Sequence, residues 1–154
     1  MNPINTLRPA TPEELIVNER IFGECNHTDW VERRDKYKNL NLVCTKCGLE
    51  FSYGNDEFEK PVVDQDTFLR SKIRKYSEED VLSNVLLRKI KEAGWNTMVK
   101  KDNGLHVCTF ENESGGFTSD PSQSRAAAIC NAAAKLGTSG LFHVSMKFVS
   151  TQRR

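Results

Sequence analysis

Four potential metal ligands stand in one short part of this chain, in two close pairs. Cys25 and His27 form the first pair, and Cys44 and Cys47 form the second pair after sixteen intervening residues. Zinc in proteins prefers four nitrogen or sulfur ligands in a tetrahedron, and two close pairs on two turns supply them. Coincidence is one alternative, but random placement would scatter the five cysteines and three histidines, whereas three of the cysteines and one of the histidines fall in a 23-residue window. The pattern predicts a Zn²⁺ site built from these four residues.

The residues around the second pair favour a zinc ribbon. Gly48 directly follows the pair, and a glycine there can take the positive φ that turns backbone N–H groups toward the sulfurs. Trp30 is expected to cover the metal. Apolar residues on both sides of the knuckle indicate two short strands; they are Leu40, Leu42, Leu49 and Phe51. We expect the ribbon-like insert to span residues 24–53.

A redox-active Cys-x-x-Cys pair and a disulfide are the alternatives to a metal. A thioredoxin-like pair opens a helix within a βαβ unit, whereas Cys44 ends a strand-like run. Four strong ligands close the tetrahedron and leave no position for water, so we expect a structural zinc rather than a catalytic one. The odd number of cysteines and the lack of a signal-peptide pattern favour reduced thiols in the cytoplasm.

Length and charge set bounds on the rest of the chain. The 154 residues have the size of one domain. We expect a poorly ordered lead-in over residues 1–10 and a single α+β domain over residues 11–154. A formal net charge of +1 does not by itself call for nucleic acid or an anionic membrane as partner, and no apolar run is long enough to span a bilayer.

Three segments carry helix signals. Thr11 and Pro12 begin the first, as cap and first-turn proline, and Gly23 is expected to end it. The second is predicted to begin at the cap Ser77 and to end at Gly94. Its expected buried stripe is Val81, Leu82, Val85, Leu86, Ile90 and Ala93.

The third predicted helix is rich in alanine, which allows close approach to a sheet. Asp120 is expected to cap it, Pro121 to occupy its first position and Gly137 to stop it. Its expected inward stripe is Ala126, Ile129, Cys130, Ala133 and Leu136.

A β-hairpin is predicted between the second and third helices. Its strands cover residues 95–101 and 105–111, and Asn103-Gly104 between them is the strongest short signal for a type I′ turn. A short third strand is expected at Phe117. On the second strand we interpret His106 and Cys108 as packing residues rather than a metal pair.

Two further segments complete the chain. Residues 54–70 are predicted to form an acidic connecting loop. Residues 141–150 alternate strictly between apolar and polar and are predicted to form a final strand, through which a homodimer is conceivable. Together the elements predict an α+β fold in which helices sandwich a small antiparallel sheet, with the zinc-ribbon-like insert.

Three stretches carry a resemblance to a known family. They are Glu14-Leu-Ile-Val-Asn-Glu-Arg-Ile-Phe-Gly23, Tyr76-Ser-Glu-Glu-Asp80 and Arg125-Ala-Ala-Ala-Ile-Cys-Asn-Ala-Ala-Ala134. Across most of residues 13–137 the chain resembles the phage ABA sandwich domain family, which comprises bacteriophage and prophage proteins of unknown function. The resemblance implies a phage origin and helices packed around a small sheet. It implies no activity, because the family has no catalytic motif to carry over.

The sequence predicts architecture better than function. It contains no Gly-x-Ser-x-Gly, no Walker loop after a strand, no dinucleotide fingerprint and no His-Glu-x-x-His. We therefore expect a non-enzymatic phage-type accessory protein that binds a host protein or a small ligand, and one such role is to blunt a host defence. A small anionic ligand is expected at the start of the last helix, at Ser122, Ser124 and Arg125 beside Gly115-Gly116.

Nucleic-acid binding is the alternative function. Zinc ribbons often contact nucleic acid, and basic residues stand in the predicted ribbon loop: Arg33, Arg34, Lys36 and Lys38. The order of three strands and a helix also resembles a double-stranded-RNA-binding domain. Those domains grip phosphates with lysines at the helix start, where this chain offers Asp120 and a single arginine, Arg125.

Overall fold

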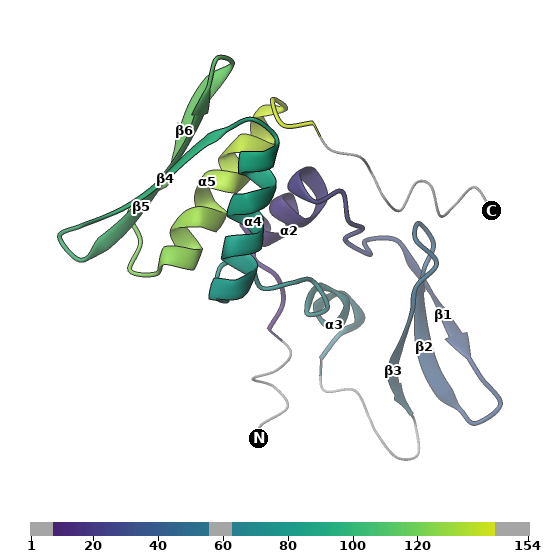
Figure 1. Ribbon diagram of the computed structural model, residues 1–154. Helices are drawn as coiled ribbons and strands as arrows, with labels where there is room; N and C mark the ends of the chain where they lie inside the picture. Colours follow the sequence, from purple (N-terminus) through teal and green to yellow (C-terminus); the bar gives the residue numbers. More distant parts are fainter. Residues whose placement is uncertain (1–7, 56–62, 144–154) are drawn as a thin grey trace.

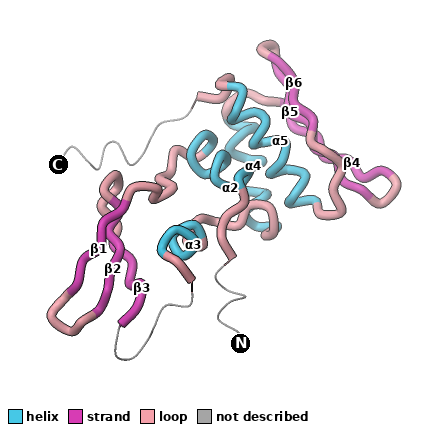
Figure 2. Tube along the Cα trace, turned by 180° about the vertical axis from the view of Figure 1, so that it is seen from behind, coloured by secondary structure: helices cyan, strands magenta, loops and turns pink. Residues whose placement is uncertain are grey.

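Two three-stranded antiparallel sheets lie at opposite ends of the molecule, with the helices between them (Figure 1). The computed structural model describes residues 8–55 and 63–143. The predicted α+β class is confirmed. The view from behind gives the same arrangement, with the sheet β4–β5–β6 beside α4 and α5 and the sheet β1–β2–β3 on the far side of α2 and α3 (Figure 2).

The first helix begins as its sequence predicts. Thr11 caps α2 (Pro12–Ile16) in a capping box: its hydroxyl accepts from the Glu14 N–H at 3.2 Å, and Glu14 Oε1 accepts from the Thr11 N–H at 3.0 Å. A π-helical turn, η1 (Val17–Ile21), continues it, and the Phe22 N–H donates to the Val17 carbonyl five residues back. Gly23 then takes φ 65° and ends the helix.

The larger sheet is the predicted hairpin with a third strand. It consists of β4 (Asn96–Asp102), β5 (Leu105–Asn112) and β6 (Gly115–Thr118) in that spatial order. The turn residues Asn103 and Gly104 have φ values of 51° and 80°, as a type I′ turn requires. The prediction of a strand at Phe117 is confirmed. Phe110 and Cys108 on β5 point into the main core.

The second helix, α4 (Asp80–Glu92), begins later than predicted and buries a narrower face. Glu79 rather than Ser77 precedes it, because the Ser77 N–H and hydroxyl both donate to the buried carboxylate of Glu14. Leu86 and Ile90 are fully buried, as predicted. The predicted burial is wrong at three positions of the stripe, since Val81 is 74% exposed, Val85 is 40% exposed and Ala93 is exposed.

The third helix, α5 (Arg125–Ser139), also differs at both ends from the prediction. Ser124 caps it, and its hydroxyl accepts from the Ala127 N–H; Asp120 and Pro121 precede the helix. The backbone of Ser122 instead pairs with that of His106, which holds this stretch alongside β5. The helix runs through Gly137 and ends at Gly140, which has φ 80°.

Gly137 has a packing role in place of the predicted stop. A Cβ at this position would lie 2.9 Å from the Arg20 Cβ and 3.1 Å from the Ile16 Cγ2. The absence of a side chain therefore lets α5 approach α2 and η1 closely. The predicted inward stripe of α5 is buried throughout, at Ala126, Ile129, Cys130, Ala133 and Leu136.

The smaller sheet is a three-stranded ribbon. β1 (Trp30–Arg34) pairs with β2 (Asn39–Cys44), which pairs with β3 (Glu50–Asn55). One short helix, α3 (Gln65–Arg70), packs Phe68 and Leu69 against Leu42 of β2. The prediction of a loop over residues 54–70 is wrong at both ends, because residues 54–55 belong to β3 and Asp64 caps α3.

Some predicted segments lie wholly or partly outside the described residues. Of the lead-in, residues 8–10 are described, and the Ala10 N–H donates to the Arg70 carbonyl. Of the predicted final strand, residues 141–143 are described and are not in a strand, while residues 144–150 lie outside. Within the described ranges, no helix is long and apolar enough to cross a membrane.

Candidate metal centre

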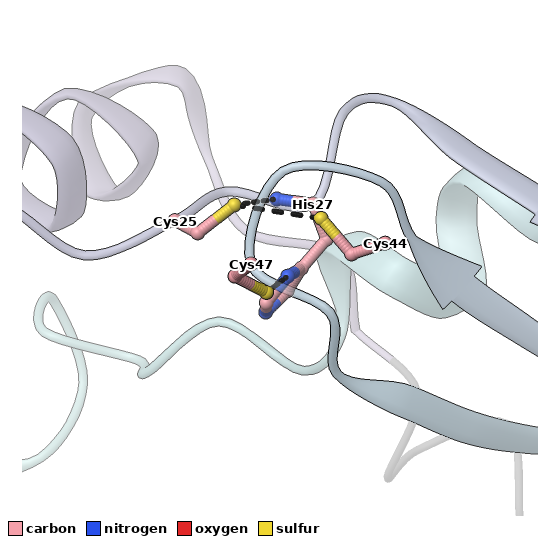
Figure 3. A group of neighbouring side chains, drawn as sticks. All are labelled: Cys25, His27, Cys44 and Cys47. Atoms are coloured by element: carbon pink, nitrogen blue, oxygen red, sulfur yellow. Dashed lines mark hydrogen bonds between the residues drawn. The ribbon is translucent and has the colours of Figure 1, made fainter. Parts of the chain in front are cut away.

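The four predicted ligands converge on one point. The ligand atoms of Cys25, His27, Cys44 and Cys47 all lie within 4.8 Å of one another. Figure 3 shows the four side chains directed toward one another from two chain segments. Cys25 and His27 come from the loop after η1, Cys44 ends β2, and Cys47 lies in the knuckle before β3. Cys25, His27 and Cys44 are buried and Cys47 is half-buried.

The distances fit a tetrahedral zinc ion. Zn–S bonds of about 2.3 Å and Zn–N bonds of about 2.0 Å place two sulfurs about 3.8 Å apart and a sulfur and a nitrogen about 3.5 Å apart. The Cys25 and Cys44 Sγ atoms are 3.6 Å apart, and the Cys47 Sγ is 3.4 Å from the His27 Nδ1. All five cysteines are free thiols in this structure, and the 3.6 Å between the Cys25 and Cys44 Sγ atoms exceeds a disulfide bond of about 2.05 Å.

Local backbone bonds shape the second ligand pair. The Gly48 N–H donates to the Cys44 carbonyl at 2.9 Å, and the Cys44 N–H donates to the Leu49 carbonyl at 2.8 Å. Gly48 has φ 81°, as the knuckle predicts. On the other side of the site, His27 has φ 56°, and its backbone N–H lies 3.4 Å from the Cys25 Sγ. A left-handed histidine is uncommon, and it brings its ring back over the site.

Without a metal, the site disfavours a full set of thiolates. The pKa of the Cys25 thiol is raised to about 12. Burial is the largest cause, and the neighbouring Cys44 and Cys47 thiols contribute to the same rise. Burial raises the pKa of Cys47 as well. Burial would also raise the pKa of Cys44, but hydrogen bonds from the Cys47 and Lys46 backbone N–H groups outweigh it and lower that pKa. A divalent cation would remove the repulsion among adjacent thiolates.

The histidine is in the protonation state that a metal needs. Burial lowers the pKa of His27, which keeps the imidazole neutral and able to donate a lone pair. Phe51 lies edge-on to the His27 ring, with ring centroids 5.0 Å apart. Trp30, expected to cover the metal, packs against the Leu42 cluster and donates its indole N–H to Asp66 at 3.0 Å.

The second predicted site, at Ser122, Ser124 and Arg125, lies at the start of α5, but internal bonds occupy it. The prediction that Gly115-Gly116 lies beside it is wrong, because a Cβ at Gly115 would lie 3.4 Å from Leu141, which follows the other end of α5. The Ser122 hydroxyl accepts from the Ser124 N–H, and the Ser124 hydroxyl caps the helix. The Arg125 guanidinium donates to the Asn84 Oδ1 at 3.0 Å. An anion here would compete with these bonds, and the anion site stays a prediction.

Two other groups of residues were considered as sites from the sequence: His106 with Cys108, and the basic residues of the ribbon. Cys108 is fully buried in the core beside Phe110, as the packing interpretation of His106 and Cys108 predicts. Of the basic residues in the ribbon, Arg33 makes a forked ion pair with Glu50. The Lys36 ammonium lies over the ring of Tyr37, 5.1 Å from its centroid.

Fold and site together define an α+β protein with a ribbon-like sheet and a three-cysteine, one-histidine cluster that could hold a metal ion. Comparison with protein-family models, with curated proteins and with solved structures finds no match to this chain.

Proposed function

We propose that this chain binds one Zn²⁺ ion at Cys25, His27, Cys44 and Cys47, and that the ion is structural. The observation that carries the proposal is the convergence of four ligand atoms within 4.8 Å, at spacings suited to a tetrahedron. Four protein ligands leave no open position for a water or a substrate, which distinguishes a structural zinc from a catalytic one. The ion would join the loop after η1 to the knuckle of the ribbon.

We further propose a non-enzymatic role, in which the zinc-stabilised protein acts by binding. The resemblance to phage ABA sandwich domains supports a phage-type accessory protein in the host cytoplasm. Its partner would be a host protein or a small anionic ligand, in a counter-defence role. No catalytic motif in the sequence argues for an enzyme.

The mass of the purified protein under native and then denaturing conditions tests both proposals. We expect a native mass that exceeds the chain mass by one zinc, which is lost on denaturation. Any additional mass lost with it would identify a carried ligand. A chain without metal and two hydrogens lighter would mean a disulfide and would contradict the zinc proposal. The Cys44→Ser variant is the control, because it removes one ligand and cannot retain the full set.

Nucleic-acid binding is the second candidate, because one part of the ribbon suits it. The β1–β2 hairpin ends in Lys36 and Tyr37, and Tyr37 is 66% exposed. Exposed aromatic rings stack on bases, and basic residues beside them contact phosphates. Arg34 and Lys38 flank this tip in the sequence, and Arg33 makes an ion pair with Glu50.

Binding of a fluorescent single-stranded RNA at low salt tests this candidate. If the hairpin tip binds RNA, the Tyr37→Ala and Lys36→Ala variants lose affinity, and affinity falls steeply as salt is added. Lys46→Ala is the matched control, since Lys46 is a ribbon lysine paired with Asp29 at 3.3 Å. No binding by the wild-type protein at low salt would exclude the candidate.

A further inference from the structure

Asn18, a buried residue of η1, holds the loop that carries the first ligand pair. Its side-chain amide donates to the Cys25 carbonyl at 3.3 Å and to the Asn26 Oδ1 at 2.9 Å. Its Oδ1 accepts from the Tyr76 hydroxyl at 2.8 Å. Asn18 is 4% exposed and Tyr76 is fully buried, so these bonds form away from water. These bonds also determine the orientation of the Asn18 amide, with Nδ2 toward the metal loop and Oδ1 toward Tyr76.

Asn26, which stands between the two ligands, extends the network into the first helix. Its Nδ2 donates to the Leu15 carbonyl at 3.0 Å. The Glu24 N–H donates to the Asn18 carbonyl, also at 3.0 Å. Residues on both sides of Cys25 are therefore bonded to α2 and η1. The π-helical turn adds one residue to this turn of the helix, and such insertions often mark functional positions.

The second ligand pair is supported from within the ribbon. Cys44 and Cys47 are held by the knuckle's own backbone bonds and by the Thr45 N–H, which donates to the Asp29 carbonyl at 2.9 Å within the ribbon. The geometry of one half of the metal site thus depends on the ribbon, and that of the other half depends on the helices. Loss of the partners of a buried amide costs more free energy than the hydrogen bonds alone, because the amide is left unsatisfied away from water. The bonds of Asn18 therefore hold the Cys25 loop rigidly.

We infer that Asn18 is a positioning residue for the metal site and that, with Tyr76, it couples metal binding to the packed helices. The inference rests on the metal binding proposed above. Asn18 does not contact the metal; it acts through the Cys25 backbone and Asn26. Because such coupling is reciprocal, the metal also stabilises the arrangement of η1 and Tyr76. Residues that orient metal ligands in this way commonly contribute about 10–100-fold to metal affinity.

Zinc competition with a chromophoric chelator tests the inference, on full-length wild-type, Asn18→Ala, Tyr76→Phe and Asn131→Ala proteins. Asn18→Ala is expected to weaken zinc binding by about 10–100-fold. Tyr76→Phe removes one hydrogen bond but keeps the ring stacked on Phe22, so it is expected to cost about 3–10-fold. Asn131→Ala is the matched control, because its side chain accepts from the Asp120 N–H before α5 and donates to Glu13 of α2, and neither partner belongs to the metal loop.

Cobalt absorption supplies the readout that a simple loss of stability would not change. If Asn18 orients the ligands, the visible bands of the cobalt-loaded Asn18→Ala protein change shape at full occupancy, whereas those of Asn131→Ala match the wild type. Should Asn18→Ala fail to fold, Tyr76→Phe decides the question by the same two readouts.

The outcomes distinguish the positioning role of Asn18 from the zinc binding on which that role depends. Wild-type zinc affinity and an unchanged cobalt spectrum in both Asn18→Ala and Tyr76→Phe would overturn the positioning role and leave the zinc site standing. A wild-type protein that takes up neither zinc nor cobalt would overturn both.

Discussion

The two sheets of this protein have the same number of strands and the same antiparallel order, but different support. The sheet β4–β5–β6 packs on α5 and contributes to a large core that includes Phe110, Leu86 and Ile90. The sheet β1–β2–β3 rests on a small cluster whose buried members among the described residues are Leu42, Phe68 and Leu69. The difference lies in how much apolar surface each sheet buries.

A three-stranded sheet with so small a core needs another source of stability. Burial provides roughly 25 cal/mol per Å² of apolar surface, and small units that bury little commonly depend on a metal or on disulfides. The candidate metal ligands lie at the end of the sheet β1–β2–β3, and none of them belongs to a strand of the sheet β4–β5–β6; they are Cys25, His27, Cys44 and Cys47. We therefore propose that a metal stabilises the sheet β1–β2–β3, whereas hydrophobic packing stabilises the sheet β4–β5–β6.

Removal of the metal ligands is expected to have the largest effect. The double variant Cys44→Ser, Cys47→Ser would lose the zinc, whose binding to structural sites provides roughly 10–16 kcal/mol. Trp30 reports on the small sheet and Trp95 on the main core, so urea unfolding of variants that keep one tryptophan separates the two regions. We expect the Trp30 transition to disappear and the Trp95 transition to persist.

Cys130→Ala serves as the control for this experiment, since Cys130 is buried in the main core and belongs to no ligand pair. It is expected to shift the Trp95 transition and to leave the zinc content at one. A double variant that kept its Trp30 transition would contradict the proposal.

Truncation in the main core is the reciprocal change. Phe110→Ala removes a fully buried ring and is expected to lower the unfolding free energy by about 3–5 kcal/mol. The measurement is urea unfolding followed by Trp95 emission, with zinc content determined on the folded variant. We expect one zinc to remain; loss of zinc from a folded Phe110→Ala protein would show that the two regions are not separately supported.

The pH dependence of the helical region depends on Glu14. Burial would raise the pKa of this carboxyl, but hydrogen bonds from Thr11, Ser77 and Arg8 outweigh it and hold the pKa below its ordinary value. A pKa lowered by folding gives stability that is present above the unfolded-state pKa of about 4.3 and is lost as pH falls through the folded-state value.

Glu14→Gln is thus expected to reduce stability at neutral pH by about 1.5–3 kcal/mol, the range for hydrogen bonds to a charged group. The difference from wild type begins to shrink below about pH 4.3, where the unfolded state takes up a proton, and it vanishes below the lower folded-state pKa, where both side chains are uncharged. Thermal unfolding monitored through Trp95 between neutral pH and pH 3 measures this. A difference that stayed constant with pH would rule out the ionised carboxylate as its source.

The smallest of these effects is expected at the contact between α5 and the first helix. Gly137→Ala introduces a methyl group 2.9 Å from the Arg20 Cβ, and overpacking of this kind costs about 1–3 kcal/mol. The higher helix propensity of alanine offsets about 1 kcal/mol of this cost, so we expect the unfolding free energy to fall by roughly 1 kcal/mol, as measured by thermal unfolding. Thr138→Ala, at the exposed neighbouring position, is the control and is expected to be neutral or stabilising.

Local signals account for what could be predicted from the sequence. The spacing of Cys25, His27, Cys44 and Cys47 identified the cluster because ligand geometry limits the number of residues between pairs. Asn103-Gly104 located the hairpin turn, and Thr11 with Glu14 located a helix start, because each of these features is decided within a few residues.

Tertiary contacts account for the errors. Asp120-Pro121 is a good helix start in isolation, but the pairing of Ser122 with His106 delays the helix to Arg125. Gly137 is a common type of helix stop, yet here it serves a close approach to Ile16 and Arg20. Asn18 carried no local signal for its role, since its partners Cys25 and Tyr76 are brought to it by the fold.

Hydrogen exchange of the intact protein, with zinc and after its removal by a chelator, shows whether the metal supports one sheet and not the other. We expect amides of β1, β2 and β3 to lose protection on zinc removal, while those of β4, β5 and α5 keep most of theirs. Equal loss of protection in both sheets, or no loss in either, would contradict this expectation.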